Sequence, residues 1–174
     1  MESSSLQTIG ENLGFIQFPT TADVGVFSYA PTFEELMDQS AKGMMSILAP
    51  SLYNIEPHQD VRNGQWNSIF DGPIDKEMIM IRWLDEILFR REIQKQWYLD
   101  GKISMQHTGN GCQIHADVIF INSDVYTPET EIKAVTSHNN FVRILERNQS
   151  FFHEDHSIPE IEGPAWISQV IFDV

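Results

Sequence analysis

The stretch TTADVGVFSYAPTFEELMDQSAKGMM, residues 20–45, contains an expected strand followed by an expected helix. Residues 24–29 are β-branched and aromatic, which favours a strand. Asp23 stands immediately before this strand, although aspartate is depleted in strands and is more usual in turns and helix caps. A carboxylate at the mouth of a strand, followed closely by Gly25, leads to the hypothesis that Asp23 helps to hold a cation.

Two amphipathic helices are predicted. Thr32 and Glu35 have the T-x-x-E spacing of a capping box ahead of a periodic apolar run, which predicts a helix over about 33–48. Asp75 is a good N-cap ahead of a second periodic run, which predicts a helix over roughly 76–91. Each helix has an apolar stripe and is expected to pack on a sheet.

Strands make up most of the remaining chain. A short strand is expected over 15–18, and period-two alternation with turn residues predicts six more after the second helix. They are expected at 94–99 and 102–107 (a hairpin across Asp100-Gly101), at 112–118 after a turn at Asn110-Gly111, at 131–138 and 141–147 (a pair joined near Asn139-Asn140), and at 166–173. This order predicts an α+β domain with two amphipathic helices packed on an antiparallel or mixed sheet, in strand–helix–strand–strand modules.

Three segments are expected to lack regular structure. Residues 1–14 are polar and are predicted to be a flexible tail, which leaves a single domain over 15–174. Residues 51–74 hold several glycines and prolines and are interpreted as a long loop, part of which is compatible with a strand. Residues 148–164 are acidic and contain two prolines.

The charge limits the classes of partner. The chain has 11 Lys and Arg against 25 Asp and Glu, a net charge of −14 at pH 7. Such a surface repels phosphate backbones, so direct nucleic-acid binding is not expected, whereas a divalent cation or a basic protein partner fits it. The alternative is that the acidity only maintains solubility.

Cysteine usage and hydropathy indicate the compartment. Cys112 is the only cysteine, so the chain has no intrachain disulfide and no thiolate metal cluster, which suits a reducing environment. No secretory signal is visible at the N-terminus, and the longest apolar stretches are far shorter than a membrane helix requires. A cytoplasmic protein without a membrane partner is expected.

Most residue types that carry chemistry have a structural interpretation. H-E-x-x-H, G-x-x-x-x-G-K-[ST] and G-x-S-x-G are not found in the sequence. Cys112 begins an alternating strand and is interpreted as a small apolar core residue. His107 and His115, on neighbouring strands, are interpreted as hydrogen-bonded strand histidines. The run 153–156, His-Glu-Asp-His, lies among further acids and is interpreted as a solvated acidic segment rather than a metal site.

The ends of the domain carry a more specific arrangement. Asp173 is followed by Val174, so a side-chain carboxylate and the expected terminal carboxylate are one residue apart. If the last strand lies beside the strand that opens at Asp23, three carboxylates converge and repel one another. A hard cation such as Ca²⁺ or Mg²⁺ resolves that conflict. The alternative is that all three groups are simply exposed strand ends.

Four blocks, in order and spread over nearly the whole chain, resemble the archease family. That family is characterised by H-T-A-D-[IV]-G with a following T-x-E-E-A helix, by D-L-x-x-L-L-x-x-[FW]-L-[DE]-E-L-L, by E-V-K-A-[IV]-T-Y-H, and by a closing strand that ends in Asp and an aliphatic residue. The similar blocks are TTADVGVFSYAPTFEEL (20–36), DKEMIMIRWLDEILF (75–89), EIKAVTSH (131–138) and ISQVIFDV (167–174). The sequence departs from the family pattern at Thr20, where histidine is usual, and at Ser137, where tyrosine is usual.

The resemblance implies an accessory protein rather than an enzyme. Archeases assist the RtcB-type RNA ligase, which seals tRNA exons with GTP and Mn²⁺, by promoting ligase guanylylation and multiple turnover. The family's Ca²⁺ ligands carry over to Asp23, Asp173 and Val174, and Gly25 is then expected to allow close backbone approach near the ion. The two departures, Thr20 and Ser137, bear on partner contact more than on the fold.

Three further residues in the similar blocks are candidates for partner contact or support: Asp75, Lys133 and His138. Their alternatives are an N-cap for Asp75 and exposed strand positions for the other two. Two rival functions remain at this stage. One is a small metal-dependent hydrolase built on the same carboxylates, and the other is a binding or chaperone module with a structural ion.

Overall fold

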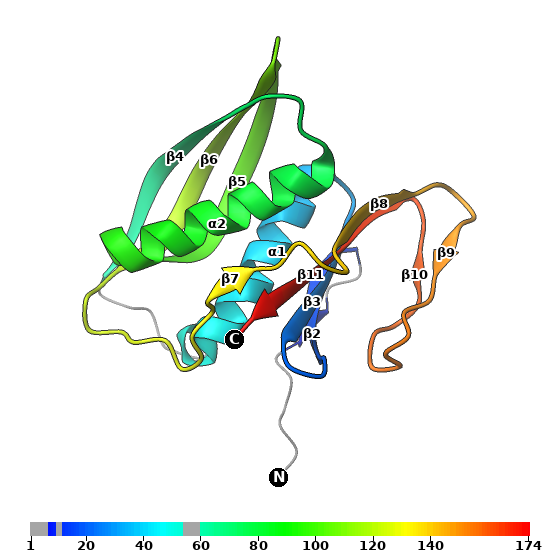
Figure 1. Ribbon diagram of the computed structural model, residues 1–174, viewed down its shortest axis with the longest axis horizontal. Helices are drawn as coiled ribbons and strands as arrows, with labels where there is room; N and C mark the ends of the chain where they lie inside the picture. The colour runs from blue at the N-terminus through cyan, green and yellow to red at the C-terminus, as the bar shows by residue number, and fades with distance from the viewer. Residues whose placement is uncertain (1–6, 10–11, 54–59) are drawn as a thin grey trace.

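The protein has the predicted α+β architecture, with two helices packed against antiparallel sheets (Figure 1). The computed structural model describes residues 7–9, 12–53 and 60–174. The helices are α1 (Phe33–Leu48), the short 3₁₀ helix η1 (Pro50–Tyr53) and α2 (Lys76–Gln94). The strands are β1 (Gln7–Ile9), β2 (Gly14–Pro19), β3 (Val24–Ala30), β4 (Val61–Asp71), β5 (Gln96–Thr108), β6 (Gly111–Asn122), β7 (Ala134–Val135), β8 (Phe141–Leu145), β9 (Ser150–Phe151), β10 (Ile161–Glu162) and β11 (Ala165–Asp173).

The first sheet joins the two ends of the domain. Its order is β1-β2-β3-β11-β7, and β8 also pairs with β11. β3 and β11 are antiparallel over seven residue pairs, from Ala30 opposite Trp166 to Val24 opposite Phe172. The prediction that the last strand lies beside the strand opening at Asp23 is therefore confirmed.

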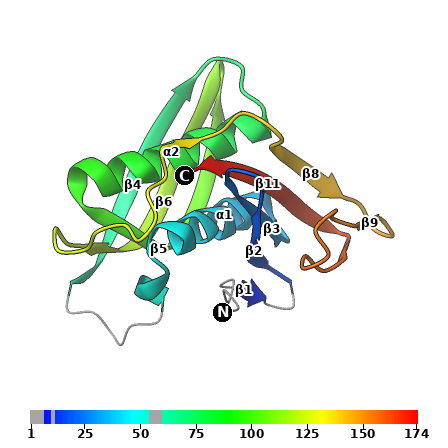
Figure 2. The same cartoon turned by 60° about the horizontal axis from the view of Figure 1, so that its bottom comes forward.

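The second sheet has the order β4-β6-β5 and carries α2 on one face (Figure 2). Its inward-facing residues alternate with exposed ones along β6, from Cys112 to Phe120. Trp83 and Leu84 of α2 are fully buried against this layer. Cys112 is buried in the same core, as predicted.

α1 lies between the two sheets, in contact with β2, β3 and β11 on one side and with β5 on the other. Because it is covered from both sides, most of its residues are buried, including polar ones such as Asp38 and Ser40. Ser40 shares a hydrogen bond of 3.0 Å with Ser168 of β11. A helix buried on nearly all sides must pair such polar groups internally.

The outer face of the first sheet is also covered. Phe27, Tyr29 and Ile167 point away from α1 into a second apolar cluster. Ile158 and Ile161 cover this cluster on the side away from the sheet. They belong to the β9–β10 arm, which we define as residues 146–163 (Figure 1). β3 and β11 are thus buried on both faces, which explains their nearly continuous apolar sequences.

Both helix starts agree with the predicted caps. Thr32 Oγ1 accepts a hydrogen bond of 3.2 Å from the Glu35 N–H, and Asp75 Oδ1 accepts one of 2.8 Å from the Met78 N–H. α1 has the predicted bounds, whereas α2 continues to Gln94 and ends where Lys95 adopts a left-handed conformation. Neither helix in the described part of the chain is long and apolar enough to cross a membrane.

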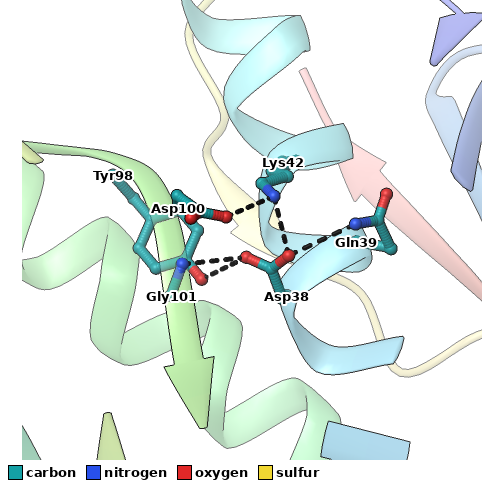
Figure 3. Close-up of polar contacts among 6 residues, drawn as sticks. All are labelled: Asp38, Gln39, Lys42, Tyr98, Asp100 and Gly101. Carbon is teal, nitrogen blue, oxygen red and sulfur yellow. Dashed lines mark hydrogen bonds and ion pairs between the residues drawn. The ribbon is translucent and has the colours of Figure 1, made fainter. Parts of the chain in front are cut away.

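The hairpin predicted across Asp100-Gly101 is wrong. β5 runs without a turn from Gln96 to Thr108 and has only a bulge at Leu99, and the turn that reverses the chain is Gly109-Asn110, one residue earlier than predicted. The dipeptide instead faces α1 (Figure 3). The Gly101 N–H donates to Asp38 Oδ1 at 3.1 Å, and Asp100 Oδ1 accepts from Lys42 Nζ at 2.5 Å.

The pair predicted between 131–138 and 141–147 is also wrong. β7 and β8 both pair with β11 and not with each other. The Asn140 side chain occupies the break between them, because its Oδ1 accepts from the Ile171 N–H and its Nδ2 donates to the Thr136 carbonyl. β7 and β8 therefore pair with β11 one after the other along its length.

All three segments expected to be irregular contain regular structure, and in residues 148–164 it is the short antiparallel pair of β9 and β10. Residues 61–71 of the predicted loop 51–74 form β4, an edge strand paired with β6 along its whole length. Residues 7–9 of the predicted tail form β1, which pairs with β2. Residues 1–6, 10–11 and 54–59 lie outside the described part, so the flexibility expected of the tail stays a prediction.

A buried carboxylate ties α1 to the second sheet (Figure 3). Asp38 is only 7% exposed. It accepts hydrogen bonds from the Tyr98 hydroxyl at 2.6 Å, from the Gly101 N–H and from Lys42 Nζ at 2.8 Å. Desolvation raises the pKa of Asp38, and Lys42 opposes that rise. A Cβ on residue 101 would lie 2.3 Å from the Tyr98 hydroxyl oxygen, so glycine is required for this approach.

We predict that Asp38→Ala lowers the free energy of unfolding by about 3–5 kcal/mol, since it removes a buried carboxylate that accepts hydrogen bonds from the Tyr98 hydroxyl, the Gly101 N–H and the Lys42 ammonium. Urea denaturation measures the change. The matched control is Asp100→Ala, which removes the other partner of Lys42. Its side chain is 54% exposed, so a loss below about 1 kcal/mol is expected. Equal losses in the two variants would contradict the structural role of Asp38.

Candidate functional site

The candidate site lies where β3 begins and β11 ends. The last paired residues are Val24 and Phe172, so continuing the antiparallel register by one residue sets Asp23 beside Asp173. On its other side β11 pairs with β7, where Asp173 is opposite Ala134. Asp173 therefore has Asp23 on one flank and the segment around Lys133 on the other. The β3–β11 and β11–β7 registers therefore bring the ends of these segments together.

Lys133 binds the end of β11 directly. Its N–H donates to the Asp173 carbonyl at 2.8 Å. Its ammonium donates to the main-chain oxygen of Val174 at 2.9 Å and lies 3.8 Å from Asp173 Oδ1. The side chains of both residues are well exposed, so the pair itself adds little stability. Lys133 is thus a member of the site.

Thr20 shapes the turn that presents Asp23. Thr20 Oγ1 accepts a hydrogen bond of 3.0 Å from the Asp23 N–H, and the Thr20 N–H donates to the Asp23 carbonyl at 3.1 Å. The turn between β2 and β3 is closed at both of its ends by these bonds. The hydroxyl at position 20 therefore fixes the backbone that carries the carboxylate.

Gly25 has a different role from the one expected. It is paired with Phe18 across β2 and β3, and the Phe18 ring lies over it. A Cβ on residue 25 would be 2.2 Å from the tip of that ring. The glycine makes room for the Phe18 ring, which belongs to the second apolar cluster.

The donors at this site suit a hard cation. Asp23, Asp173 and the end of the chain at Val174 offer only oxygen atoms, which Ca²⁺ prefers. With one ammonium from Lys133 against two aspartates, the group keeps an excess of negative charge. No cluster of three or more His, Cys, Asp or Glu side chains is arranged to hold a metal within the described ranges. A cation here would accordingly depend on main-chain oxygen and water in addition to the two aspartates.

The match to known proteins decides the family. Residues 15–174 match the model of the archease protein family (MTH1598/TM1083). The chain belongs to the archease family. The protein archease of Thermococcus kodakarensis is 26% identical over 156 residues, which cover 88% of this chain and 94% of that relative. The protein archease of Methanopyrus kandleri is 27% identical over 159 residues, with the same shares of both chains covered.

The archease fold is also found among solved structures. The solution structure of Methanobacterium thermoautotrophicum protein 1598 superimposes with a TM-score of 0.60 at 19% identity. The alignment covers 92% of this chain and 98% of that one. At this identity the likeness shows the fold alone, and it agrees with the two-helix, antiparallel arrangement described above.

Of the other residues in the family-like blocks, Asp75 lies at the far end of β11 from Asp173, whereas Ser137 and His138 follow β7, which pairs with the end of β11. Asp75 is the N-cap of α2, and the neighbouring Lys76 ammonium lies over the rings of Phe33 and Trp166, near the beginning of β11. Asp173 is at the opposite end of that strand. His138 is exposed, and its main chain is held by Thr136 just beyond β7. Ser137 is exposed beside it.

Two further histidines, His115 and His153, have polar partners within the described ranges. His115 Nδ1 lies 2.5 Å from Asn67 Oδ1, and His115 is opposite Ser104 in the sheet, so it does not face His107. In the run 153–156, His153 is held by Gln169. None of these residues joins the archease carboxylates.

We predict that Gly25→Ala destabilises the protein by about 1–3 kcal/mol, because the new methyl group overlaps the Phe18 ring in a packed core. Thermal or urea unfolding measures the loss. In a Phe18→Ala background the same substitution should cost almost nothing, since the obstacle has been removed. A penalty that persists in the double variant would show that position 25 is constrained by its backbone and not by the ring.

Proposed function

We propose that the protein is a metal-binding accessory protein that activates an RtcB-type RNA ligase by protein–protein contact. Membership of the archease family supports the assignment. The observation that carries it is the β3–β11 register, which sets the motif aspartate Asp23 beside Asp173, with Lys133 bonded to the same strand end. The protein would promote guanylylation and turnover of the ligase without catalysing a reaction of its own.

Asp23, Asp173 and the terminal carboxylate of Val174 would hold one divalent cation, with calcium favoured. Carboxylate oxygens and water suit its irregular coordination better than the strict octahedron of magnesium. When bound, the ion would neutralise the converging carboxylates. Asp23 and Asp173 would orient it, and Lys133 would stay available to donate to the partner or to a carboxylate.

Charge supports a protein partner over RNA. The net charge of −14 repels phosphate, whereas a basic RNA-handling enzyme attracts it and associates faster. Thr20 holds the turn that carries Asp23, and Ser137 is exposed just beyond β7. The departures from the family pattern would therefore tune contact with the ligase.

We predict that Asp23→Asn and Asp173→Asn each weaken calcium binding about tenfold or more, because each removes one charged ligand while the fold remains. Isothermal calorimetry measures the affinity, and circular dichroism checks the fold. Asp71→Asn, at the end of β4, is the matched control and should bind calcium like the wild type. A C-terminal tag, which turns the Val174 carboxylate into an amide, should also weaken binding. Undiminished affinity in these variants would show that the ion site lies elsewhere.

Lys133→Met is expected to act in the opposite direction. Removing a unit positive charge about 4 Å from Asp173 should strengthen calcium binding about fivefold, since lysine and ion compete for the same oxygens. The same calorimetric titration tests this prediction. Weaker binding in Lys133→Met would mean that the lysine supports the ion and does not compete with it.

Activation of the ligase tests the function itself. We expect the wild-type protein with calcium to accelerate guanylylation of the RtcB-type ligase from the same organism. Asp173→Asn should lose most of that effect, whereas the Asp71→Asn control keeps it. Fluorescence anisotropy with tRNA at about 150 mM salt should show no binding by the accessory protein alone. Failure to accelerate guanylylation, or micromolar tRNA binding, would contradict the proposal.

A further inference from the structure

A hollow of about 570 Å³ opens between the first sheet and the β9–β10 arm. Its volume lies within the usual range of binding sites. Its walls come from four separate parts of the chain: the end of β2, the segment before β8, β11 and the arm. The lining includes Phe18, Thr20, Phe141, Phe152, Glu154 and Gln169.

The floor of the hollow is fixed by a chain of hydrogen bonds. The Asp155 N–H donates to His153 Nδ1 at 2.9 Å, so that nitrogen carries no proton and the ring proton is on Nε2. Nε2 therefore donates to Gln169 Oε1 at 2.7 Å. Gln169 Nε2 donates in turn to the Asn139 carbonyl at 2.7 Å. Residues from the arm, β11 and the β7–β8 segment are thus joined by hydrogen bonds across the floor.

The rim combines an exposed aromatic ring with negative charge. Phe152 is 71% exposed beside the hollow. The arm holds five carboxylates and one arginine, a balance of −4, and Glu154 is exposed at the edge of the hollow. Hydrogen bonds from Ser157 hold the pKa of Asp155 below its ordinary value, so this acid stays charged. Exposed aromatic residues at a pocket rim are typical anchors of protein interfaces.

The hollow adjoins the carboxylate site. Thr20 lines it, and Thr20 is bonded to Asp23 through both its hydroxyl and its N–H. Asn139, whose carbonyl belongs to the floor, follows His138 directly. A partner bound at Asp23 and Asp173 would therefore meet the hollow as the next surface on the molecule.

We propose that the hollow binds a basic segment of the partner protein, with an apolar side chain against Phe152 and a lysine or arginine paired with Glu154. Charge complementarity supports this occupant, because the arm is acidic within a chain of net charge −14. Arg143, which lies over the Phe141 ring on the opposite wall, would donate to main-chain carbonyls of the bound segment. The inference rests on the proposed function, since it adds a second contact for the same ligase.

An exposed aromatic residue on α2 provides a matched control. Phe89 is 51% exposed and has the acid Glu92 nearby on the helix, like Phe152 with Glu154. Unlike Phe152, it is not among the residues that line the hollow. Equivalent substitutions in the two pairs thus distinguish the loss of a partner contact in the hollow from a general effect of removing surface hydrophobicity or charge.

The test uses the purified RtcB-type ligase from the same organism as probe. Biolayer interferometry measures its dissociation constant for the wild type and for Phe152→Ala, Glu154→Lys, Phe89→Ala and Glu92→Lys. The two arm variants should each raise the dissociation constant about tenfold, and the two α2 variants should not. Glu154→Lys should also lower the salt dependence of association. Calcium affinity and the urea midpoint should stay at wild-type values, because both arm side chains are exposed.

The outcomes separate this inference from the proposed function. If the wild type binds and activates the ligase while both arm variants do the same, the hollow is not a contact and the inference is overturned alone. If the wild type neither binds nor activates the ligase, both are overturned. Light scattering tests the remaining occupant, which is a second copy of the chain. If the wild type is a dimer and Phe152→Ala dissociates it, the hollow binds a second copy and the choice of partner is overturned.

Discussion

The antiparallel pairing of β3 with β11 is the constraint on which the rest of the molecule depends. It pairs a strand near the beginning of the domain with the last strand, so the two ends of the domain lie side by side within one sheet. Both faces of the pair are buried, one under α1 and the other under the β9–β10 arm. The same register places Asp23 beside Asp173. The core, the arm and the carboxylate site therefore all depend on this register, and a shift of the pairing by one residue would disturb all three.

α1 packs against both sheets and so connects the first sheet to the second. It is covered on both sides, and its one well-buried carboxylate, Asp38, takes donors from β5 and from its own helix. A buried charge of this kind is a costly way to gain stability but a specific way to fix the bulge at Leu99 against the helix. The two sheets thus keep a defined spacing, while the Asp173 carboxylate at the end of β11 remains exposed.

Local signals in the sequence were sufficient for the elements whose causes are local. The caps at Thr32 and Asp75 act within one turn of helix, and both were predicted with their helices. The pairing of the last strand with the strand that opens at Asp23 could also be predicted, because an acid stands at the end of each of these two strands. The contact of Asp100-Gly101 with α1 could not be predicted from the sequence, because its partners Asp38 and Lys42 lie about 60 residues away. The hollow depends on His153, whose partners come from distant strands.

Hydrogen–deuterium exchange with and without the ligase tests the central claim that the carboxylate end of β3 and β11 is the surface that acts on it. The account predicts slower exchange on ligase binding at the amides of 20–23 and 133–135, which lie beside Asp23 and Asp173, and unchanged exchange in β4 and β6. Exchange protection confined to the β4–β6–β5 sheet, with the 20–23 turn unaffected, would contradict it.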